Sequence, residues 1–421
     1  MDELGRRTIL TAGLATALAA CTTATPAQPK PGHADLSNWD DVRALFPLGK
    51  DLVQTAAFVL AAHPAPVRDA IDRHRRGLDA DTEAYLHSHG TAEEELRKTA
   101  ASYLGGTPDQ VAFTDSTTMG LGILYSGMRL AAGQDVLTST HDFSAHHAAL
   151  DLMARRTGAK VRKVALYDDP RAATEADVVA RLRAAIAPNT RVVAITWVHS
   201  STGVRLPVPA IAAMVAEVNA GRSPDARALL CVDGVHGFGA VDIPVAELGC
   251  DFLSTGTHKW LFGPRGTGVL WGKAWDALDP VIPTFSYGDS PAGRFTPGGY
   301  HSFEHRWALK EAFELHTAIG RTKIAERIAV QATRLKEGLA KIPSVTLVTP
   351  DDPDMSAGIV CCQVDGFDDN NAYTAVVLLR QAGIVASVTP YEQQYLRFGP
   401  SIVTTPEQMD QVVDAVRALR P

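Results

Sequence analysis

The chain has 421 residues and a mass of 44.9 kDa, and it is 46% hydrophobic and 21% charged. This composition is typical of a globular protein with two or three domains, and it excludes a disordered or collagen-like chain. The net charge of −7, from 40 Lys and Arg against 47 Asp and Glu, gives no indication of nucleic-acid binding.

The first residues are typical of an export signal. Arg6 and Arg7 precede a short apolar stretch from Ile9 to Ala20, and this arrangement resembles a twin-arginine signal. The stretch is too short to span a membrane. We therefore expect a signal peptide over residues 1–20 and export by the twin-arginine pathway to the periplasm. A cytosolic enzyme with a fortuitously basic and apolar start is the alternative.

The signal ends in Leu18-Ala19-Ala20-Cys21, which resembles a bacterial lipobox whose cysteine is acylated. Residues 22–34 are rich in Thr, Ala, Pro, Lys and Gly, a composition typical of a flexible linker. We expect a tether over residues 21–36 and, through acylated Cys21, an anchor to the membrane. The other four cysteines lack zinc-binding spacing, and we expect no metal site.

Between about residues 92 and 272, β-branched runs alternate with helical patterns. Strands are predicted at Val111–Thr114, Asp135–Ser139, Val161–Leu166, Val192–Thr196, Leu229–Val232, Phe252–Thr255 and Gly268–Trp271. Helices between them are predicted at Ala145–Ala154, Ala173–Ile186 and Val208–Val218. This alternation favours an α/β fold with a mostly parallel seven-stranded sheet that has helices on both faces. Ligands of such sheets bind at the carboxyl ends of the strands.

Pro280 to Gly299 is rich in Pro, Gly and Ser, which is typical of a domain junction. A long helical pattern, from about Trp307 to Ile342, follows it. Shorter patterns come next, at Thr346–Val348, Gly358–Val364, Asn371–Ala382, Val385–Val388, Leu396–Gly399 and, for a last helix, from about Thr405. We therefore expect a large domain over residues 37–285 and a smaller C-terminal α+β domain over residues 286–421.

The segment from Thr255 to Gly268 is the most informative in the chain. Lys259 stands just after a predicted buried strand, beside a turn rich in Gly and Pro, which is a poor place for a solvated charge. Desolvation lowers the pKa of a lysine and leaves a nucleophilic amine. Such an amine can form a Schiff base with an aldehyde cofactor.

Two upstream segments supply partners for such a cofactor. Asp233 ends an apolar strand pattern, where a cationic pyridinium nitrogen would satisfy a carboxylate that is otherwise costly to bury. Ser116, Thr117 and Thr118 follow another strand and open a helix, so their hydroxyls and amides suit a phosphate. A plain helix cap is the alternative at both places.

Together these residues resemble the class V aminotransferase family of pyridoxal-phosphate enzymes, over about residues 37–419. The resemblance implies fold type I and pyridoxal 5′-phosphate as cofactor. It assigns the Schiff base to Lys259, the pyridine nitrogen to Asp233 and the neighbourhood of the ring hydroxyl to His236, which we expect to be the catalytic residues. It assigns further cofactor contacts to Thr117, Thr118 and His258 at the phosphate, Phe143 on the ring and Ser200 at the ring hydroxyl.

The chain departs from the family at Gly256, where many members have a phosphate-binding serine; Thr255 or Thr257 is expected to compensate. The resemblance also implies a homodimer with shared active sites. The region from Gly298 to Ser302, with Tyr300 as the cofactor contact, would complete the partner's site.

The same resemblance assigns Arg397 to the α-carboxylate of an amino-acid substrate. A fork-shaped guanidinium suits that task, and the apolar residues around Arg397 make an unpaired charge there costly. A salt bridge to Glu392 or Glu407 is the alternative.

The reaction at Cα stays open at this point. The loop before Arg397 has no cysteine, which argues against persulfide-forming desulfuration, and Cys361 and Cys362 look structural. The sequence is most similar to the isopenicillin-N-epimerase-like branch, which favours an aminotransferase or an epimerase-like enzyme. A C–S lyase and a non-catalytic cofactor-binding protein are the alternatives. Epimerisation needs a second proton donor, for which His141 and His199 are the candidates, and His141 is also a candidate substrate contact.

Overall fold

The computed structural model describes residues 34–49, 51–284, 290–369 and 371–420. The predicted signal peptide, Cys21 and most of the predicted tether lie outside these residues. Within them, no helix combines the length and the apolar character that a membrane span requires.

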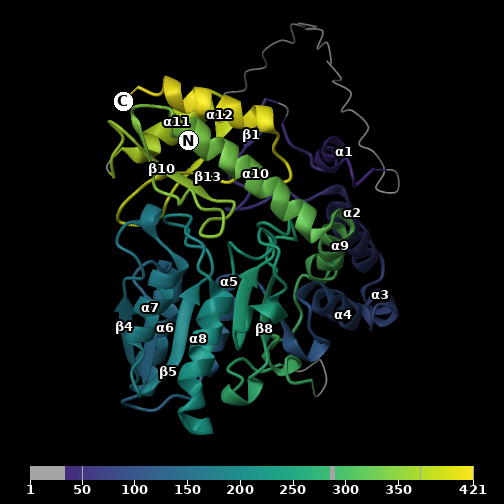
Figure 1. Ribbon diagram of the computed structural model, residues 1–421. Coiled ribbons are helices and arrows are strands. Elements are labelled where there is room, and N and C mark those ends of the chain that lie inside the picture. The colour runs from purple at the N-terminus through teal and green to yellow at the C-terminus, as the bar shows by residue number, and fades with distance from the viewer. Residues whose placement is uncertain (1–33, 50, 285–289, 370, 421) are drawn as a thin grey trace, which may run out of the picture.

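A seven-stranded sheet forms the centre of the large part of the molecule (Figure 1). Its strands are β2 (Val111–Thr114), β3 (Asp135–Ser139), β4 (Lys160–Val164), β5 (Thr190–Thr196), β6 (Leu229–Asp233), β7 (Phe252–Gly256) and β8 (Gly268–Gly272). They lie in the order β2-β8-β7-β6-β5-β3-β4, and β8 alone runs antiparallel to its neighbours. The mostly parallel seven-stranded sheet is therefore confirmed.

Helices cover both faces of this sheet because its strands are apolar on both sides. Val136 of β3 and Val192 of β5 belong to one hydrophobic cluster, with α5 (Thr117–Gly127) and α6 (Ser144–Thr157). The next residues along the chain, Leu137 and Val193, belong to a second cluster, with α7 (Glu175–Ala185) and α8 (Val208–Ala220). Successive side chains of a strand point to opposite faces, so a continuous apolar run needs cover on both.

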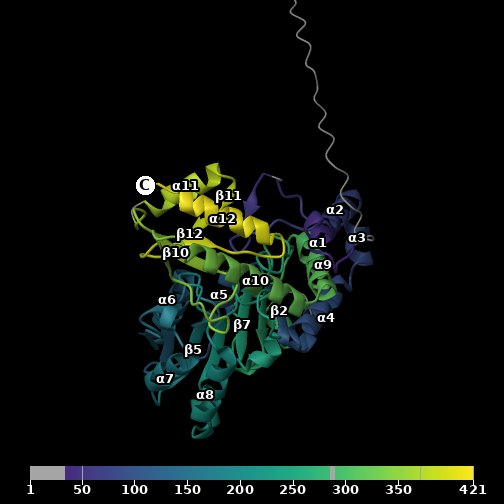
Figure 2. The ribbon, with the colours of Figure 1, turned by 45° about the horizontal axis from the view of Figure 1, so that its top comes forward.

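A group of helices flanks the β2 side of the sheet (Figure 2). It consists of α1 (Trp39–Ala44), α2 (Ala65–Ala80), α3 (Thr82–Ser88), α4 (Ala92–Leu104) and α9 (Phe303–Ile319). Helix α9 packs against α2 and α4, so residues from the start and from the later part of the chain meet here.

The C-terminal part contains an antiparallel sheet in the order β12-β13-β10-β9. Its elements are β9 (Val345–Leu347), β10 (Val360–Val364), β12 (Ser387–Val388), β13 (Leu396–Phe398), α10 (Arg321–Leu339), α11 (Ala372–Gln381) and α12 (Pro406–Ala418). The short strand β1 (Val53–Gln54) pairs in parallel with β11 (Ile384–Val385), which ties the N-terminal segment to this part. A separate hydrophobic cluster includes Leu339, Leu379 and Val412.

The helical pattern predicted from about Trp307 to Ile342 forms two helices, α9 and α10. They are separated by Gly320, whose φ of 98° is a conformation that favours glycine. The turn lets α9 pack beside the large sheet while α10 joins the C-terminal part.

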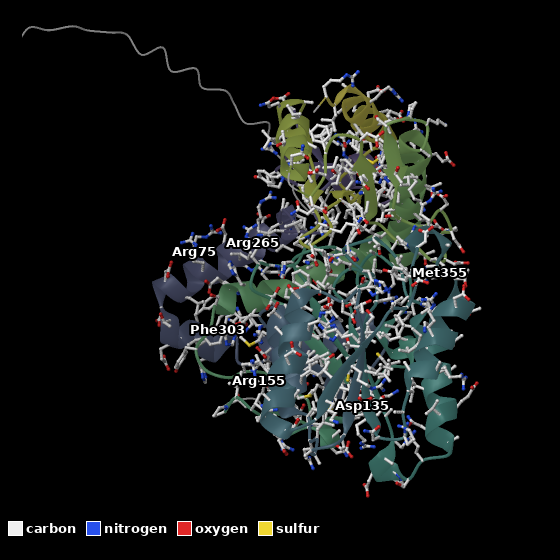
Figure 3. All side chains as sticks on the ribbon, turned by 90° about the vertical axis from the view of Figure 1, so that its left-hand side faces the viewer. Arg75, Asp135, Arg155, Arg265, Phe303 and Met355 are labelled. Carbon is white, nitrogen blue, oxygen red and sulfur yellow. The ribbon has the colours of Figure 1, made fainter. Side chains whose placement is uncertain are left out.

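The carboxyl ends of the parallel strands face the C-terminal part. Asp135, the first residue of β3, lies at the opposite end of the sheet (Figure 3). The loop after β5 contacts the C-terminal part, because the Thr349 hydroxyl donates to the Thr202 carbonyl (2.7 Å). Residues that follow the strands are thus enclosed between the two parts.

Candidate active site

A pocket of about 250 Å³ lies at this edge of the sheet. Ten of the residues predicted from the sequence line it: Ser116, Thr117, Thr118, Phe143, Ser200, Asp233, His236, His258, Lys259 and Arg397. The remaining lining residues are Phe58, Val59, Leu121, Ala145, Thr196, Val235, Pro390 and Tyr391.

The topology of the large sheet brings these residues together. Thr117 begins α5 after β2, Phe143 precedes α6 after β3, Ser200 follows β5, Asp233 ends β6, and Lys259 follows β7. Parallel strands end at the same edge of a sheet, so residues up to 142 positions apart share one pocket. Arg397, on β13, reaches the pocket from the C-terminal part.

Asp233 is buried without a compensating cation bonded to it. Asp233 is 3% exposed, and its Oδ1 accepts one hydrogen bond, from the Val235 N–H (3.0 Å). Burial raises the pKa of Asp233 to about 7, although the Val235 N–H and the charge of Lys259 lower it. The carboxylate is therefore suited to a cationic ligand.

The pKa of Lys259 is shifted in the direction opposite to that of Asp233. Burial lowers the pKa of Lys259 to about 8, because it outweighs the attraction of Asp233, and the charge of Arg397 lowers it further. Its amine makes no hydrogen bond within the described part of the chain. A substantial fraction of this amine is neutral near neutral pH, as a nucleophile requires.

Several polar atoms of the pocket are buried without a partner in the described structure. They are Oγ1 of Thr117, Oγ1 of Thr196, Nδ1 of His236 and Nδ1 of His258. Burial lowers the pKa of both histidines, so both are neutral. Unsatisfied buried polar atoms are costly, and their convergence in one pocket fits a polar ligand that binds them. With the amides at the start of α5, they fit the phosphate and ring substituents of pyridoxal phosphate.

Neighbouring side chains lie close to Gly256. A Cβ atom at this position would lie 2.8 Å from Cε1 of His258 and 3.3 Å from Oγ1 of Thr117. A side chain there would require His258 to shift. Thr255 and Thr257, expected to compensate for the family's serine, instead donate to the carbonyls of Gly256 and Thr267 and do not line the pocket.

Arg397 is buried, and its hydrogen bonds go to neutral groups. Nε donates to Oγ of Ser387 (3.1 Å), Nη1 to the Ser200 carbonyl (3.2 Å) and Nη2 to the Val388 carbonyl (3.4 Å). The guanidinium also lies over the Phe58 ring, 4.8 Å from its centroid. Within the described part of the chain Arg397 forms no salt bridge, so the alternative of an ion pair with Glu392 or Glu407 is not found. This charge is available to a carboxylate ligand.

Thr257, His141, Tyr300 and the candidate proton donor His199 do not line the pocket. Thr257 is fully buried behind it and donates to the Thr267 carbonyl (3.0 Å). His141 stacks on Tyr167 with ring centroids 3.8 Å apart, and its Nε2 accepts from the Leu166 N–H (3.2 Å). Tyr300 is 83% exposed on the surface of the single chain.

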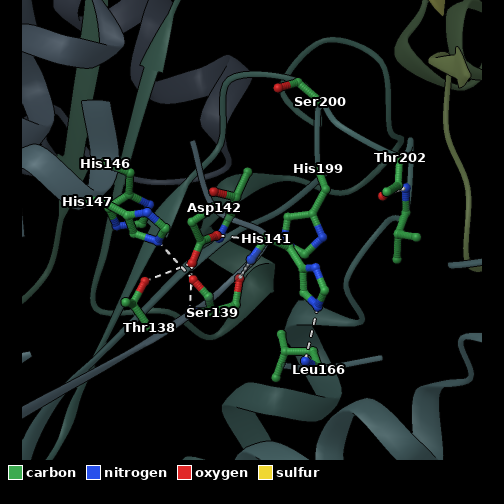
Figure 4. A network of polar contacts seen from close by, with 12 residues as sticks. Thr138, Ser139, His141, Asp142, His146, His147, Leu166, His199, Ser200 and Thr202 are labelled. Atoms are coloured by element: carbon green, nitrogen blue, oxygen red, sulfur yellow. Dashed lines mark hydrogen bonds and ion pairs between the residues drawn. The ribbon is translucent and has the colours of Figure 1, made fainter. Parts of the chain in front are cut away.

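A buried polar network lies beside the pocket, around Asp142 (Figure 4). Asp142 accepts hydrogen bonds from the Thr138 hydroxyl (2.7 Å) and from the backbone N–H groups of Ser139 (2.8 Å) and Thr196 (2.9 Å). Nε2 of His199 lies 3.6 Å from Asp142. The network joins the ends of β3 and β5 and so fixes the segments that carry Phe143 and Ser200.

No pattern in the sequence points to Tyr391 as a site residue. It lies on the loop between β12 and β13, and its hydroxyl is 2.9 Å from Oγ of Ser200. Its ring meets the Phe143 ring edge to face, with centroids 5.9 Å apart. The surrounding loop is polar and has no periodicity, so only the fold brings Tyr391 to the pocket.

Comparison with known proteins adds a family and several relatives. The family model described as "Aminotransferase class-V" matches residues 61–388. An isopenicillin N epimerase from Streptomyces clavuligerus is 29% identical, over 91% of this chain and 99% of its own length. A cysteine desulfurase from Klebsiella pneumoniae is 26% identical, over 73% of this chain and 79% of its own.

Solved structures share the fold. A cystine C–S lyase in complex with cysteine persulfide has a TM-score of 0.80 at 20% identity, with 88% of this chain and 99% of that chain covered. A cysteine desulfurase from Escherichia coli has a TM-score of 0.76 at 22% identity, with 90% and 97% covered.

Proposed function

Since this chain belongs to the class V aminotransferase family and is a pyridoxal-phosphate-dependent enzyme, we propose that it transfers protons at Cα of an amino-acid substrate, as an aminotransferase or an epimerase-like enzyme. One observation carries the proposal. A buried carboxylate whose pKa is raised, a half-buried lysine whose pKa is lowered and a buried arginine without an acidic partner among the described residues line the same pocket. Such opposed shifts in one cleft are typical of acid–base sites.

The cofactor's place follows from the unsatisfied groups. Thr117, His258 and the first amides of α5 would hold the phosphate, and Asp233 would hold the pyridinium nitrogen. When bound, pyridoxal phosphate withdraws electrons from Cα and makes its proton acidic. Asp233 supports this effect because a negative charge stabilises the protonated ring nitrogen.

The chain's own residues supply binding and proton transfer. Lys259 would hold the cofactor through its aldehyde, and its amine can hold or move a proton at Cα. Arg397 orients the substrate through its carboxylate. Phe58 and Leu121, together with the aromatic ring of Phe143, limit the access of water to the pocket.

Desulfuration through a persulfide has no support in this pocket. Cys361 and Cys362 are fully buried on β10, and burial raises the pKa of Cys361 to about 12. Neither thiol lines the pocket. A buried thiol of this kind is a poor nucleophile.

The proposal is tested by incubating the purified enzyme, saturated with pyridoxal phosphate, with single amino acids in D₂O. Proton NMR reports exchange at Cα, chiral chromatography reports inversion, and mass spectrometry reports oxo-acid products after addition of an oxo-acid acceptor. Exchange at Cα of at least one amino acid is expected. Formation of pyruvate, with sulfide from cysteine or with cysteine persulfide from cystine, as the main reaction would instead identify a C–S lyase. No exchange with any amino acid would contradict the proposal.

We also propose a homodimer in which residues 298–302 of one subunit complete the site of the other. In support, Tyr300 (83%), Leu60 (52%) and Val59 (47%) are large side chains that are strongly exposed in the single chain, and Val59 lines the pocket. Light scattering at the assay concentration tests this proposal. A fully active monomer would contradict it.

Export by the twin-arginine pathway, with acylation of Cys21, stays a proposal that rests on the sequence motif. Cell fractionation of the wild type against an Arg6→Lys, Arg7→Lys variant tests the export. Loss of periplasmic protein is expected for the variant. An unchanged distribution would contradict the proposal.

A further inference from the structure

We propose that Tyr391 is the second proton-transfer residue of this pocket, acting on the face of the substrate's Cα opposite Lys259, so that the enzyme inverts the configuration of its amino-acid substrate. The inference rests on the proposed function, because it presupposes proton transfer at Cα. It narrows that function to racemisation or epimerisation.

The sheet order places Lys259 and Tyr391 on opposite walls of the pocket. Lys259 follows β7, whereas Phe143 follows β3, and β6 and β5 lie between these strands. Neighbouring strands are about 4.8 Å apart, and β7 is two strands from β5 and three from β3, so the two walls are separated by roughly 10 to 14 Å at the level of the strands. Tyr391 lies on the β5 and β3 side, since its hydroxyl meets Ser200 and its ring meets Phe143. Asp233, at the end of β6, lies between the two walls.

Ser200 connects the phenol of Tyr391 with the carboxylate-binding group. Its hydroxyl pairs with Tyr391 at 2.9 Å, while its carbonyl accepts from Nη1 of Arg397 at 3.2 Å. The carboxylate of an amino acid is bonded directly to Cα. A substrate held by Arg397 therefore has its Cα close to the group that contains Tyr391.

The phenol is suited to donate a proton. Burial raises the pKa of Tyr391 above its usual range, although the hydrogen bond with Ser200 opposes this effect, so the hydroxyl is protonated at ordinary pH. The Ser200 hydroxyl can both donate and accept, so it can return a proton to the phenolate.

The step balances in protons. On one face the C–H bond at Cα breaks and its proton passes to Nζ of Lys259. On the other face a C–H bond forms with the proton from Oη of Tyr391. Solvent then restores the phenol through Ser200, and the Lys259 ammonium releases its proton to solvent.

The histidines suggested by the sequence are less well placed. His199 is fully buried outside the pocket lining, and its Nδ1 pairs with the Tyr167 hydroxyl (2.9 Å). The His141 ring stacks on Tyr167, also outside the lining. Among the described residues that line the pocket, Tyr391 is the one tyrosine.

The test compares wild type, Tyr391→Phe and the control Tyr395→Phe, which lies on the same loop outside the pocket lining. Each holoenzyme is incubated in D₂O with the L and D forms of every chiral proteinogenic amino acid. For Tyr391→Phe, inversion should fall by about 100-fold or more, since general acid–base groups contribute about 10² to 10⁴ in rate. Deuterium exchange with retention, through Lys259, should stay within about 3-fold for one enantiomer. Tyr395→Phe should resemble the wild type.

A binding measurement without turnover completes the test. The cofactor-free forms are titrated with pyridoxal phosphate by tryptophan fluorescence, and Tyr391→Phe should keep the wild-type Kd within about 3-fold. A large loss of cofactor affinity would make Tyr391 a cofactor-binding residue and overturn the inference. Unchanged inversion in Tyr391→Phe would overturn it as well.

The outcomes separate this inference from the proposed function. Wild-type exchange at Cα without inversion of any amino acid would overturn the role of Tyr391 and leave the proposed function standing. The absence of any exchange at Cα would overturn both.

Discussion

Asp142 and Asp233 lie at the same edge of the large sheet, are 2% and 3% exposed, and have opposite surroundings. Asp142 accepts hydrogen bonds from one hydroxyl and two backbone N–H groups, whereas Asp233 accepts one. Burial raises the pKa of Asp233 to about 7. Burial acts in the same direction on Asp142, but His199, His146 and Thr138 outweigh it and hold its pKa well below the usual range.

The buried Lys336 and the half-buried Lys259 repeat the contrast. Lys336 donates to the carbonyls of Pro350 (2.8 Å) and Asp351 (3.1 Å) and to Oγ of Ser356 (3.0 Å). Lys259 has no such bonds among the described residues. Satisfied charges hold segments together, and unsatisfied charges are available for a ligand. The distinction therefore separates the residues that stabilise this fold from those that we propose perform its chemistry.

Replacement of Lys259 should have the largest effect. Lys259→Ala should lose covalent attachment of the cofactor and lower turnover by about 10⁴-fold or more, because no other amine lines the described pocket. Borohydride reduction followed by peptide mass spectrometry locates the attachment. Lys273→Ala, at the far end of β8, is the control. Attachment that persists in Lys259→Ala would show that another lysine serves this role.

The pH dependence of the unfolding free energy should show that the Asp233 carboxylate lacks a cationic partner in the cofactor-free protein. Its pKa of about 7 in the folded, cofactor-free protein exceeds the unfolded value of about 3.9, so the folded state binds the proton more tightly. This group's contribution is therefore lost as pH rises from about 4 to about 7, by an amount on the order of 4 kcal/mol.

Urea unfolding of the cofactor-free wild type and of Asp233→Asn, from pH 4 to pH 8, measures this loss. The free energy of unfolding of the wild type should fall relative to the variant across this range. The gap should shrink when pyridoxal phosphate is added. Parallel pH profiles would mean that Asp233 is already satisfied in the cofactor-free protein.

Asp142→Asn should destabilise the folded protein at pH 7, because the Asp142 carboxylate accepts hydrogen bonds from three donors. An amide has one acceptor oxygen in place of two, and its NH₂ group would meet the donors of Thr138, Ser139 or Thr196. We expect a loss of about 3 kcal/mol in unfolding free energy at pH 7, measured in urea. Asp151→Asn, exposed on α6, is the control and should change little. A small loss for Asp142→Asn would remove the contrast with Asp233.

The sequence predicted the large sheet well because its strands are apolar on both faces. The predicted bounds of β2 and β3 agree with the structure, and those of β5 to β8 differ by one or two residues. The division of the helical pattern at Gly320 was not predicted, because the residues on both sides favour helices. The pairing of β1 with β11 joins segments about 330 residues apart and leaves no local pattern.

The site was predictable where a residue lies at the end of a strand or just after it, as Asp233 and Lys259 do. It was not predictable where side-chain packing decides. Thr257 is next but one to Lys259, yet it turns toward Thr267 and away from the pocket. Tyr391 reaches the pocket only because the C-terminal part packs over the large sheet.

Arg397 is intermediate between the satisfied charges, such as Asp142, and the unsatisfied ones, such as Asp233. It donates hydrogen bonds to neutral acceptors but lacks an acidic partner among the described residues. Arg397→Lys keeps the charge and loses the two-pronged geometry that a carboxylate needs. The kcat/KM for amino acids should fall by about 100-fold, whereas binding of the corresponding amines, which lack the carboxylate, should change by less than about 3-fold. Cofactor absorbance reports both measurements. Arg327→Lys, whose guanidinium binds the Thr404 carbonyl (2.7 Å), is the control. If the amines lose as much affinity as the amino acids, Arg397 belongs with Asp142 and Lys336, as a charge that holds its loop in place.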